Sequence, residues 1–168
     1  MTLQRLNALP DDEAEAAFLT CCGSTRWAWE MARLRPFGSQ ADVHAAGADV
    51  WFALDPADWD EAFRAHPRIG EHKAAPSQSA QAAAWSAQEQ AGAASASDEL
   101  AAALAEGNRV YEERFGRIYI VCASGKTGKQ LLSILHERLG NDPDTELRAA
   151  AAEQAKITGL RLEKLFDG

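Results

Sequence analysis

The sequence of 168 residues has few cysteines, no long apolar run and no excess of basic residues. Of its three cysteines, Cys21 and Cys22 are chain neighbours, which is a poor geometry for a disulfide, and Cys122 lies alone in an apolar run. We therefore expect reduced thiols. No uncharged apolar stretch is long enough to span a membrane, and the amino terminus lacks the basic-then-apolar order of a signal peptide. These absences predict a cytoplasmic protein with no membrane partner.

The charge balance excludes a further class of partner. Asp and Glu number 25 against 17 Lys and Arg, so the formal net charge is −8 and the isoelectric point is near 5.0. A nucleic-acid-binding surface needs a concentrated basic stripe that neutralises phosphates, so we predict no nucleic-acid partner. With 46% hydrophobic and 25% charged residues, the composition is ordinary for a globular protein, and the length fits one domain over residues 1–168.

Helical periodicity extends over most of the chain. A helix that opens at Pro10 is predicted to end at Gly23, and a second is predicted to begin near Ser24 with Leu34 facing inward. The second helix must end before Pro36, because a residue that precedes proline avoids helical geometry. The other predicted helices are 43–54, 55–66, 74–105 as two helices with a break near Gly92, about 98–115, 126–139 and 145–166.

One segment departs from this pattern. Residues 117–122, Arg-Ile-Tyr-Ile-Val-Cys, have clear strand propensity, but one strand cannot form a sheet. In a buried extended connector the backbone N–H and C=O groups need partners, and a ligand can be one of them. The sequence therefore predicts an all-α fold, a single-domain bundle of about eight helices with one short extended segment near 117–122.

His66 is the first candidate for chemistry, because it precedes Pro67 at a predicted helix end, a rigid corner from which a side chain can project. Imidazole titrates near neutral pH, and Glu89 supplies a carboxylate that a fold could bring to it, a pair suited to general acid/base catalysis. A lone histidine in such a place is more often a capping or core residue, so both interpretations stay open. The other histidines, His44, His72 and His136, are interpreted as surface or packing residues. Since none has a Cys or carboxylate at ligand spacing, we predict no metal site.

Ser86-Ala87-Gln88-Glu89 can be interpreted in two ways. The pattern fits a capping box, in which Glu89 reaches back to a helix start at Ser86. However, Trp85 and the alanines before it favour helix, so a start at Ser86 would interrupt a good helical stretch. If the helix continues instead, Ser86, Glu89 and Gln90 share one face and can hold several polar atoms of one ligand.

Two other motifs are less informative. Ser124-Gly125-Lys126-Thr127 matches the end of a phosphate-binding loop, but Ile120 stands where that motif requires glycine, so we predict a plain turn. Arg161 lies among leucines on the last predicted helix, where an arginine either extends to solvent or pairs with an anion. The sequence alone favours extension to solvent.

Together these residues resemble one family over nearly the whole chain, the 2-oxo-4-hydroxy-4-carboxy-5-ureidoimidazoline (OHCU) decarboxylases of urate degradation. Many ordered matches make the resemblance specific, although Gly159 stands where we expect a larger, often basic residue. The matching stretches are Leu6-Asn7, Cys21-Cys22-Gly23-Ser24 with Arg26-Trp27, Arg35-Pro36-Phe37, His66-Pro67-Arg68-Ile69-Gly70, Ser86 with Glu89-Gln90, Arg114-Phe115-Gly116, Ile120 to Lys126, and Lys156-Ile157-Thr158 with Leu160-Arg161-Leu162.

The resemblance implies an all-helical, homodimeric lyase without a cofactor, which converts OHCU to (S)-allantoin and carbon dioxide. It implies that His66 is the central acid/base and that Glu89 orients His66 or shares its proton. The substrate-binding residues that it implies are Pro67, Ser86, Gln90, Tyr119, Ile120, Val121, Cys122, Ala123 and Arg161. Two alternatives stay open, a helical binding module without activity and another ureide- or imidazoline-processing enzyme such as a hydrolase.

Overall fold

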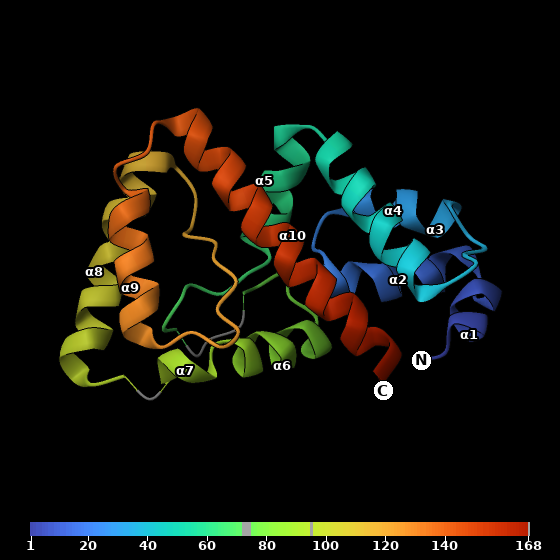
Figure 1. Ribbon diagram of the computed structural model, residues 1–168, viewed down its shortest axis with the longest axis horizontal. Helices are drawn as coiled ribbons and strands as arrows, with labels where there is room; N and C mark the ends of the chain where they lie inside the picture. The colour runs from blue at the N-terminus through green and yellow to red at the C-terminus, as the bar shows by residue number, and fades with distance from the viewer. Residues whose placement is uncertain (72–74, 95, 168) are drawn as a thin grey trace. The chain divides into compact units, whose positions relative to one another are not determined.

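The computed structural model describes residues 1–71, 75–94 and 96–167, and these ranges contain ten helices and no strand (Figure 1). The prediction of an all-α fold is therefore confirmed. The contacts divide the chain into two compact units, unit 1 with Met1–Ala62 and Ala155–Gly168, and unit 2 with Phe63–Gln154. His72 lies outside the described residues. Within the described ranges, no helix combines the length and apolar character needed to cross a membrane.

Unit 1 consists of helices packed around buried aromatic residues. Its helices are α1 (Leu3–Ala8), α2 (Asp11–Cys21), α3 (Thr25–Arg33), α4 (Gln40–Ala53), most of α5 (Pro56–Arg64) and the second half of α10 (Pro143–Asp167). The Ser24 hydroxyl accepts a hydrogen bond from the Trp27 N–H at 3.2 Å and begins α3 as predicted. Trp27 and Phe18 pack edge to face with ring centroids 5.9 Å apart. Leu34 is 50% exposed, so its predicted inward orientation is wrong.

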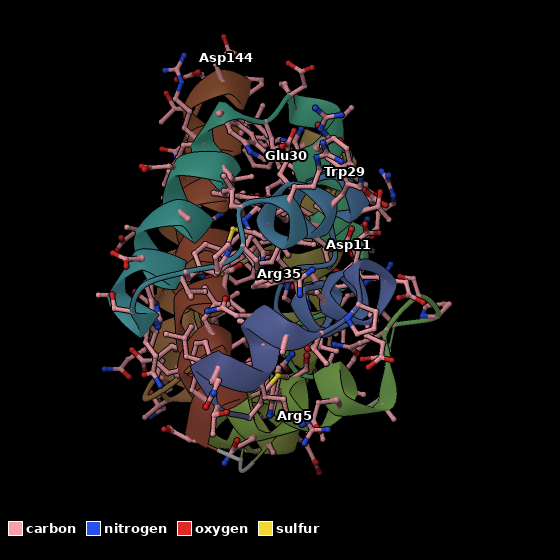
Figure 2. All side chains as sticks on the ribbon, turned by 90° about the vertical axis from the view of Figure 1, so that its right-hand side faces the viewer. Arg5, Asp11, Trp29, Glu30, Arg35 and Asp144 are labelled. Carbon is pink, nitrogen blue, oxygen red and sulfur yellow. The ribbon has the colours of Figure 1, made fainter. Side chains whose placement is uncertain are left out.

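Arg35 joins the ends of α1 and α2 to the loop after α3. Its guanidinium donates to the Leu6 carbonyl at 2.9 Å and the Leu9 carbonyl at 2.6 Å, and it pairs with Asp11, which is labelled beside it in Figure 2. The Asn7 amide exchanges two 2.9 Å hydrogen bonds with the backbone of Phe37. Leu6-Asn7 and Arg35-Pro36-Phe37, two of the stretches that resemble the OHCU decarboxylases, thus hold this part of unit 1 together.

Unit 2 contains α6 (Ala80–Glu89), α7 (Ala91–Ala94), α8 (Asp98–Phe115), α9 (Gly128–Arg138) and the first half of α10. Figure 1 shows α8 and α9 side by side. The buried core of this unit includes Leu104, Tyr111, Tyr119, Leu131 and Leu135. The break predicted near Gly92 falls at Gln90, where α6 ends. Gly92 itself lies in α7, and a Cβ atom there would lie 2.1 Å from the Lys126 carbonyl oxygen. Only glycine allows this close approach.

Candidate active site

His66 lies just after the end of α5, and its imidazole reaches α10. The backbone N–H of His66 donates to the Phe63 carbonyl at 3.1 Å, and Pro67 then prevents the helix from continuing. The imidazole Nε2 lies 2.7 Å from the Oε1 atom of Gln154, whose side chain is completely buried. The rigid corner predicted from the sequence is therefore present, and a buried amide holds the imidazole.

The face of α6 predicted to bind a ligand is buried. The N-cap of α6 is Ser79, whose hydroxyl accepts from the Ala82 N–H at 3.2 Å, so the helix runs through Ser86. The capping-box interpretation of Ser86 and Glu89 is therefore wrong. Ser86 is 4% exposed and Glu89 9% exposed. The Gln78 amide donates to the Ser86 hydroxyl at 2.6 Å, which fixes that hydroxyl against the segment before the helix.

Gln90, the third polar residue of this group, holds the loop after His66. Its amide oxygen accepts from the Gly70 N–H at 3.0 Å, and its amide nitrogen donates to the Arg68 carbonyl at 3.5 Å. Gly70 has a φ of +86°, a left-handed conformation that favours glycine. Among the described residues, each amide atom of Gln90 makes one of these two contacts, and an amide has two donors and two lone pairs.

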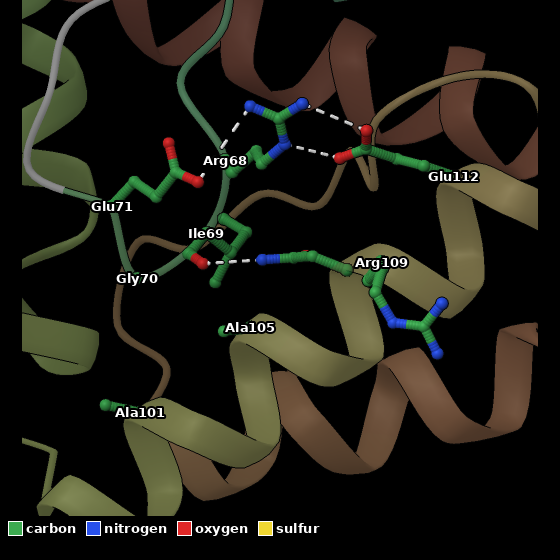
Figure 3. A pocket seen from close by; sticks show the side chains of 9 residues that line it. Arg68, Ile69, Gly70, Glu71, Ala101, Ala105, Arg109 and Glu112 are labelled. Carbon is green, nitrogen blue, oxygen red and sulfur yellow. Dashed lines mark hydrogen bonds and ion pairs between the residues drawn. The ribbon is translucent and has the colours of Figure 1, made fainter.

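Side chains of α8 also hold this loop, and a pocket of unit 2 lies between the loop and α8. The Asn108 amide donates to the Ile69 carbonyl at 2.9 Å, and the Arg68 guanidinium makes a two-point ion pair with Glu112 (Figure 3). The pocket between this loop and α8 has a volume of about 280 Å³. His66 is not among its lining residues, so this pocket does not place the predicted acid/base group in a cavity.

The extended segment 118–123 forms neither helix nor strand, as predicted. On one edge its backbone is held by charged side chains: Arg138 donates to the Ile120 carbonyl, and Lys126 donates to the Cys122 carbonyl at 2.8 Å. On the same edge the Cys122 N–H donates to the Glu153 carboxylate at 2.7 Å. These contacts fall on alternate residues, as they do along one edge of an extended chain.

The opposite edge of the segment belongs to Val121 and Ala123, which are 3% and 4% exposed. In the part of the chain that the structure describes, the backbone N–H groups of these two residues donate no hydrogen bond to protein. Buried N–H groups are nearly always paired, so this edge can accept a ligand. The Tyr119 side chain faces the core, where its hydroxyl donates to the Leu131 carbonyl at 3.0 Å.

Electrostatics connect the segment to α6. Burial raises the pKa of the Cys122 thiol, the carboxylates of Glu153 and Glu89 raise it further, and the Lys126 ammonium lowers it. Glu89 therefore lies within electrostatic reach of Cys122. In unit 2 the structure thus brings together α6, the segment 118–123 and the α10 residues that hold His66.

Arg161 belongs to unit 1, whereas the other predicted site residues belong to unit 2. It is 3% exposed, so the interpretation that its guanidinium extends to solvent is wrong. Burial raises the pKa of Cys22 to about 11, and the Arg161 guanidinium acts against this shift. Arg161 is therefore a buried cation near a protonated thiol.

Sequence reasoning missed the two α10 residues that hold the site. Glu153 holds the segment 118–123, and its neighbour Gln154 holds His66. One signal was available, because these two polar residues directly follow four alanines in the longest helix of the described chain. Their partners, however, depend on tertiary structure that no local pattern reveals.

The chain is similar to known proteins over most of its length. A model of the OHCU decarboxylase family matches residues 7–163. The chain belongs to the OHCU decarboxylase family. It is 44% identical over 153 residues to the uric acid degradation bifunctional protein TTL of Arabidopsis thaliana, covering 90% of this chain and 47% of that protein. It is 31% identical over 133 residues to the 2-oxo-4-hydroxy-4-carboxy-5-ureidoimidazoline decarboxylase of Amia calva, covering 79% and 75%.

A solved structure supports the same family and fold. The crystal structure of an OHCU decarboxylase in the presence of (S)-allantoin has a TM-score of 0.79 and 36% sequence identity to this chain. That match covers 95% of this chain and all of the solved chain. By contrast, the chain spans about half the length of the Arabidopsis relative.

Proposed function

We propose that this protein decarboxylates OHCU to (S)-allantoin and carbon dioxide. The observation that carries the proposal is the histidine held 2.7 Å from a buried amide on α10, beside a carboxylate that fixes the segment 118–123. Membership of the OHCU decarboxylase family supports the reaction, and so does similarity to a structure crystallised in the presence of (S)-allantoin.

The substrate supplies its own electron sink, so the reaction needs no cofactor. The bond between the ring carbon and its carboxylate breaks, carbon dioxide leaves, and the electron pair moves toward the adjacent ring imine, whose nitrogen takes up a proton. The hydroxyl group on the first carbon then loses its proton and becomes a carbonyl, while the neighbouring carbon gains a proton. In total, the OHCU carboxylate and one proton yield allantoin and carbon dioxide.

His66 and Glu89 would carry the proton transfers. His66 takes the hydroxyl proton or delivers the proton to carbon, since imidazole exchanges protons near neutral pH. Glu89, a buried carboxylate, orients His66 or shares its proton. Arg161 would pair with the carboxylate or carbonyl oxygens of the substrate, because a guanidinium can donate two parallel hydrogen bonds.

The remaining contacts would position the ring and ureido groups of the substrate. A cyclic ureide has alternating N–H and C=O groups, and the edge of the segment at Val121 and Ala123 offers N–H donors to it. Ile120 and Cys122 contribute by their place in the same segment, and Tyr119 anchors its start. Pro67, Ser86 and Gln90 complete the proposed substrate-binding residues.

OHCU also decays without a catalyst, and the enzyme would control the stereochemistry of the product. Uncatalysed proton transfer can reach either face of the carbon, which gives racemic allantoin, whereas a fixed donor selects one face.

We also propose that the protein works in the cytoplasm as a homodimer, as its composition and the family resemblance imply. Light scattering of the purified protein tests the dimer, and a mass of one chain would exclude it.

Product analysis tests this function against the alternatives. OHCU is generated from urate with the upstream oxidase and hydrolase, and released carbon dioxide and ammonia are both measured with and without the protein. The proposal expects faster release of carbon dioxide and no ammonia. Ammonia release would indicate a hydrolase, and gas release equal to the blank would favour a binding module.

A further inference from the structure

The hydrogen bond between His66 and Gln154 bears on which imidazole nitrogen carries the proton. The Oε1 atom of Gln154 lies 2.7 Å from Nε2 of His66. An amide oxygen can only accept a hydrogen bond, so this contact requires a hydrogen on Nε2. In neutral His66, the lone pair then belongs to Nδ1.

We propose that Gln154 is a positioning residue that fixes His66 as the Nε2–H tautomer, so that Nδ1 is the nitrogen that takes up a proton. This inference rests on the proposed function for its catalytic meaning. The structural part stands alone, because it concerns one hydrogen bond. When Nδ1 takes up a proton, Nε2–H still donates to Gln154, so the ring need not turn during the reaction.

Three features of Gln154 suit this role. Its side chain is completely buried, so bulk water does not compete for the hydrogen bond. It lies on α10, a helix of 25 residues, which gives the amide a rigid base. Its amide is also neutral, so it orients the ring without the strong preference for imidazolium that a carboxylate would impose.

The neighbouring residue extends the same logic to the substrate-binding segment. Glu153 accepts the Cys122 N–H at 2.7 Å, so two consecutive residues of α10 hold His66 and the segment 118–123. The position of the acid/base group relative to the proposed ring-binding edge is thereby set by one helix. Substituting either residue should therefore affect kcat more than KM.

Nitrogen NMR of the unmodified protein tests the tautomer directly. The protein is labelled with 15N-histidine, and the His66 signals are assigned by their loss in His66→Ala. At a pH where His66 is neutral, the inference expects a protonated Nε2 and an unprotonated Nδ1. A protonated Nδ1 would overturn it. This result does not depend on turnover, so inactivity toward OHCU would refute the proposed function and leave this inference standing.

Two variants test the positioning role. Gln154→Leu removes the acceptor at similar volume, and we expect a mixture of tautomers and a ten- to hundredfold lower kcat, on the order of the effect of other residues that orient a functional histidine. Gln154→Glu keeps the acceptor and adds a charge that favours imidazolium. We expect this change to move the acidic limb of the pH–rate curve to higher pH by about one unit.

The charge control is Gln81→Glu, on the exposed surface of α6. Arg64 and Arg68 in the same stretch of chain, Glu153 beside Gln154 on α10, and Glu89, the proposed partner of His66, are unchanged among these variants. The pH–rate curve of Gln81→Glu should match that of the unmodified protein. An unchanged tautomer in Gln154→Leu, together with an unmoved curve in Gln154→Glu, would show that Gln154 only fills space.

Discussion

Unit 2 contains two groups of polar residues that differ in the kind of contact that holds them. In the first, the Arg138 cluster, Glu146 accepts from Arg138, Tyr111 and Asn141, and Arg138 also holds the Ile120 carbonyl. In the second, His66 meets a neutral amide, and the Glu153 carboxylate meets a backbone N–H.

The two groups differ in whether a full positive charge faces a full negative charge. In the Arg138 cluster a full positive charge faces a full negative charge, and the two aromatic rings of Tyr111 and Tyr119 lie against the guanidinium, 6.0 and 5.0 Å from its carbon. Such a pair strongly opposes any change in protonation. The contact of His66 with Gln154, by contrast, joins the imidazole to an uncharged amide. Burial of charge alone therefore does not identify an active site.

Breaking the Arg138 cluster should give the largest effect, and on stability. Arg138→Met leaves the Glu146 carboxylate buried without its counter-charge, and we expect the free energy of unfolding to fall by about 3–5 kcal/mol. Urea unfolding measures this change. Replacing both residues with Arg138→Met and Glu146→Leu should recover part of the loss. A single variant as stable as the unmodified protein would contradict the comparison.

His66→Ala should show the opposite pattern. We expect stereospecific turnover to fall by about 10²–10⁴-fold, because the general acid/base is lost, with the helical circular dichroism spectrum preserved. Steady-state kinetics and the optical purity of the product measure the effect. Full rate with full optical purity would remove His66 from the mechanism.

Glu89→Gln should have a smaller effect of the same kind. It keeps the size of the side chain and removes the charge, and we expect turnover to fall by about 10²-fold if the carboxylate acts with His66. Glu99→Gln, on the exposed surface of α8, is the matched control. Unchanged kinetics with a lower melting temperature would assign Glu89 a structural role instead.

Above pH 9, the pH dependence of stability should report the buried phenols and thiols, among them Tyr111 of the Arg138 cluster. Burial raises the pKa of Tyr111 above its ordinary value of 10.0, and its hydrogen bond to Glu146 raises it further. Above pH 10 the unfolded chain loses this proton while the folded chain keeps it, so stability falls as pH rises, by up to about 1.4 kcal/mol per pH unit for one group.

Urea unfolding between pH 8 and pH 11 checks this slope. Cys22 adds to it from about pH 9, since burial raises its pKa from 9.0 to about 11. Tyr111→Phe should reduce the slope above pH 10. Stability that rises with pH in this range would contradict the assignment.

The smallest effect is expected at the ion pair of Arg68 with Glu112. These side chains are 44% and 28% exposed, so water and salt weaken their attraction. Glu112→Gln should change the free energy of unfolding by less than about 1 kcal/mol, and the difference should shrink at high salt. A loss as large as that of Arg138→Met would mean that exposure does not separate the two kinds of ion pair.

Much of the fold was predictable from local signals. The helix over 98–115 follows from its periodicity and coincides with α8, and Ser24 begins α3 as its capping chemistry indicates. Helices α1 and α7 were not predicted, because they have only six and four residues. The alternatives at Ser86 could not be decided from the sequence, since Ser79 also suits an N-cap.

The candidate site was less predictable, for a physical reason. His66 and Glu89 are recognisable by residue type, and the resemblance to the OHCU decarboxylases implies the roles proposed for them. Gln154 and Glu153 act through contacts with residues 88 and 31 positions away in the chain. No periodicity or capping rule encodes such distances, so the residues that hold a site are harder to find than those that would react.

The most direct test of the proposed function is circular dichroism of freshly generated OHCU, followed with the unmodified protein, with His66→Ala and with no protein. The proposal predicts that the (S)-allantoin signal appears rapidly only with the unmodified protein, while His66→Ala remains folded and close to the blank. Decay identical to the blank in all three samples would contradict it, and would mean that the chain has kept the family's fold without its activity.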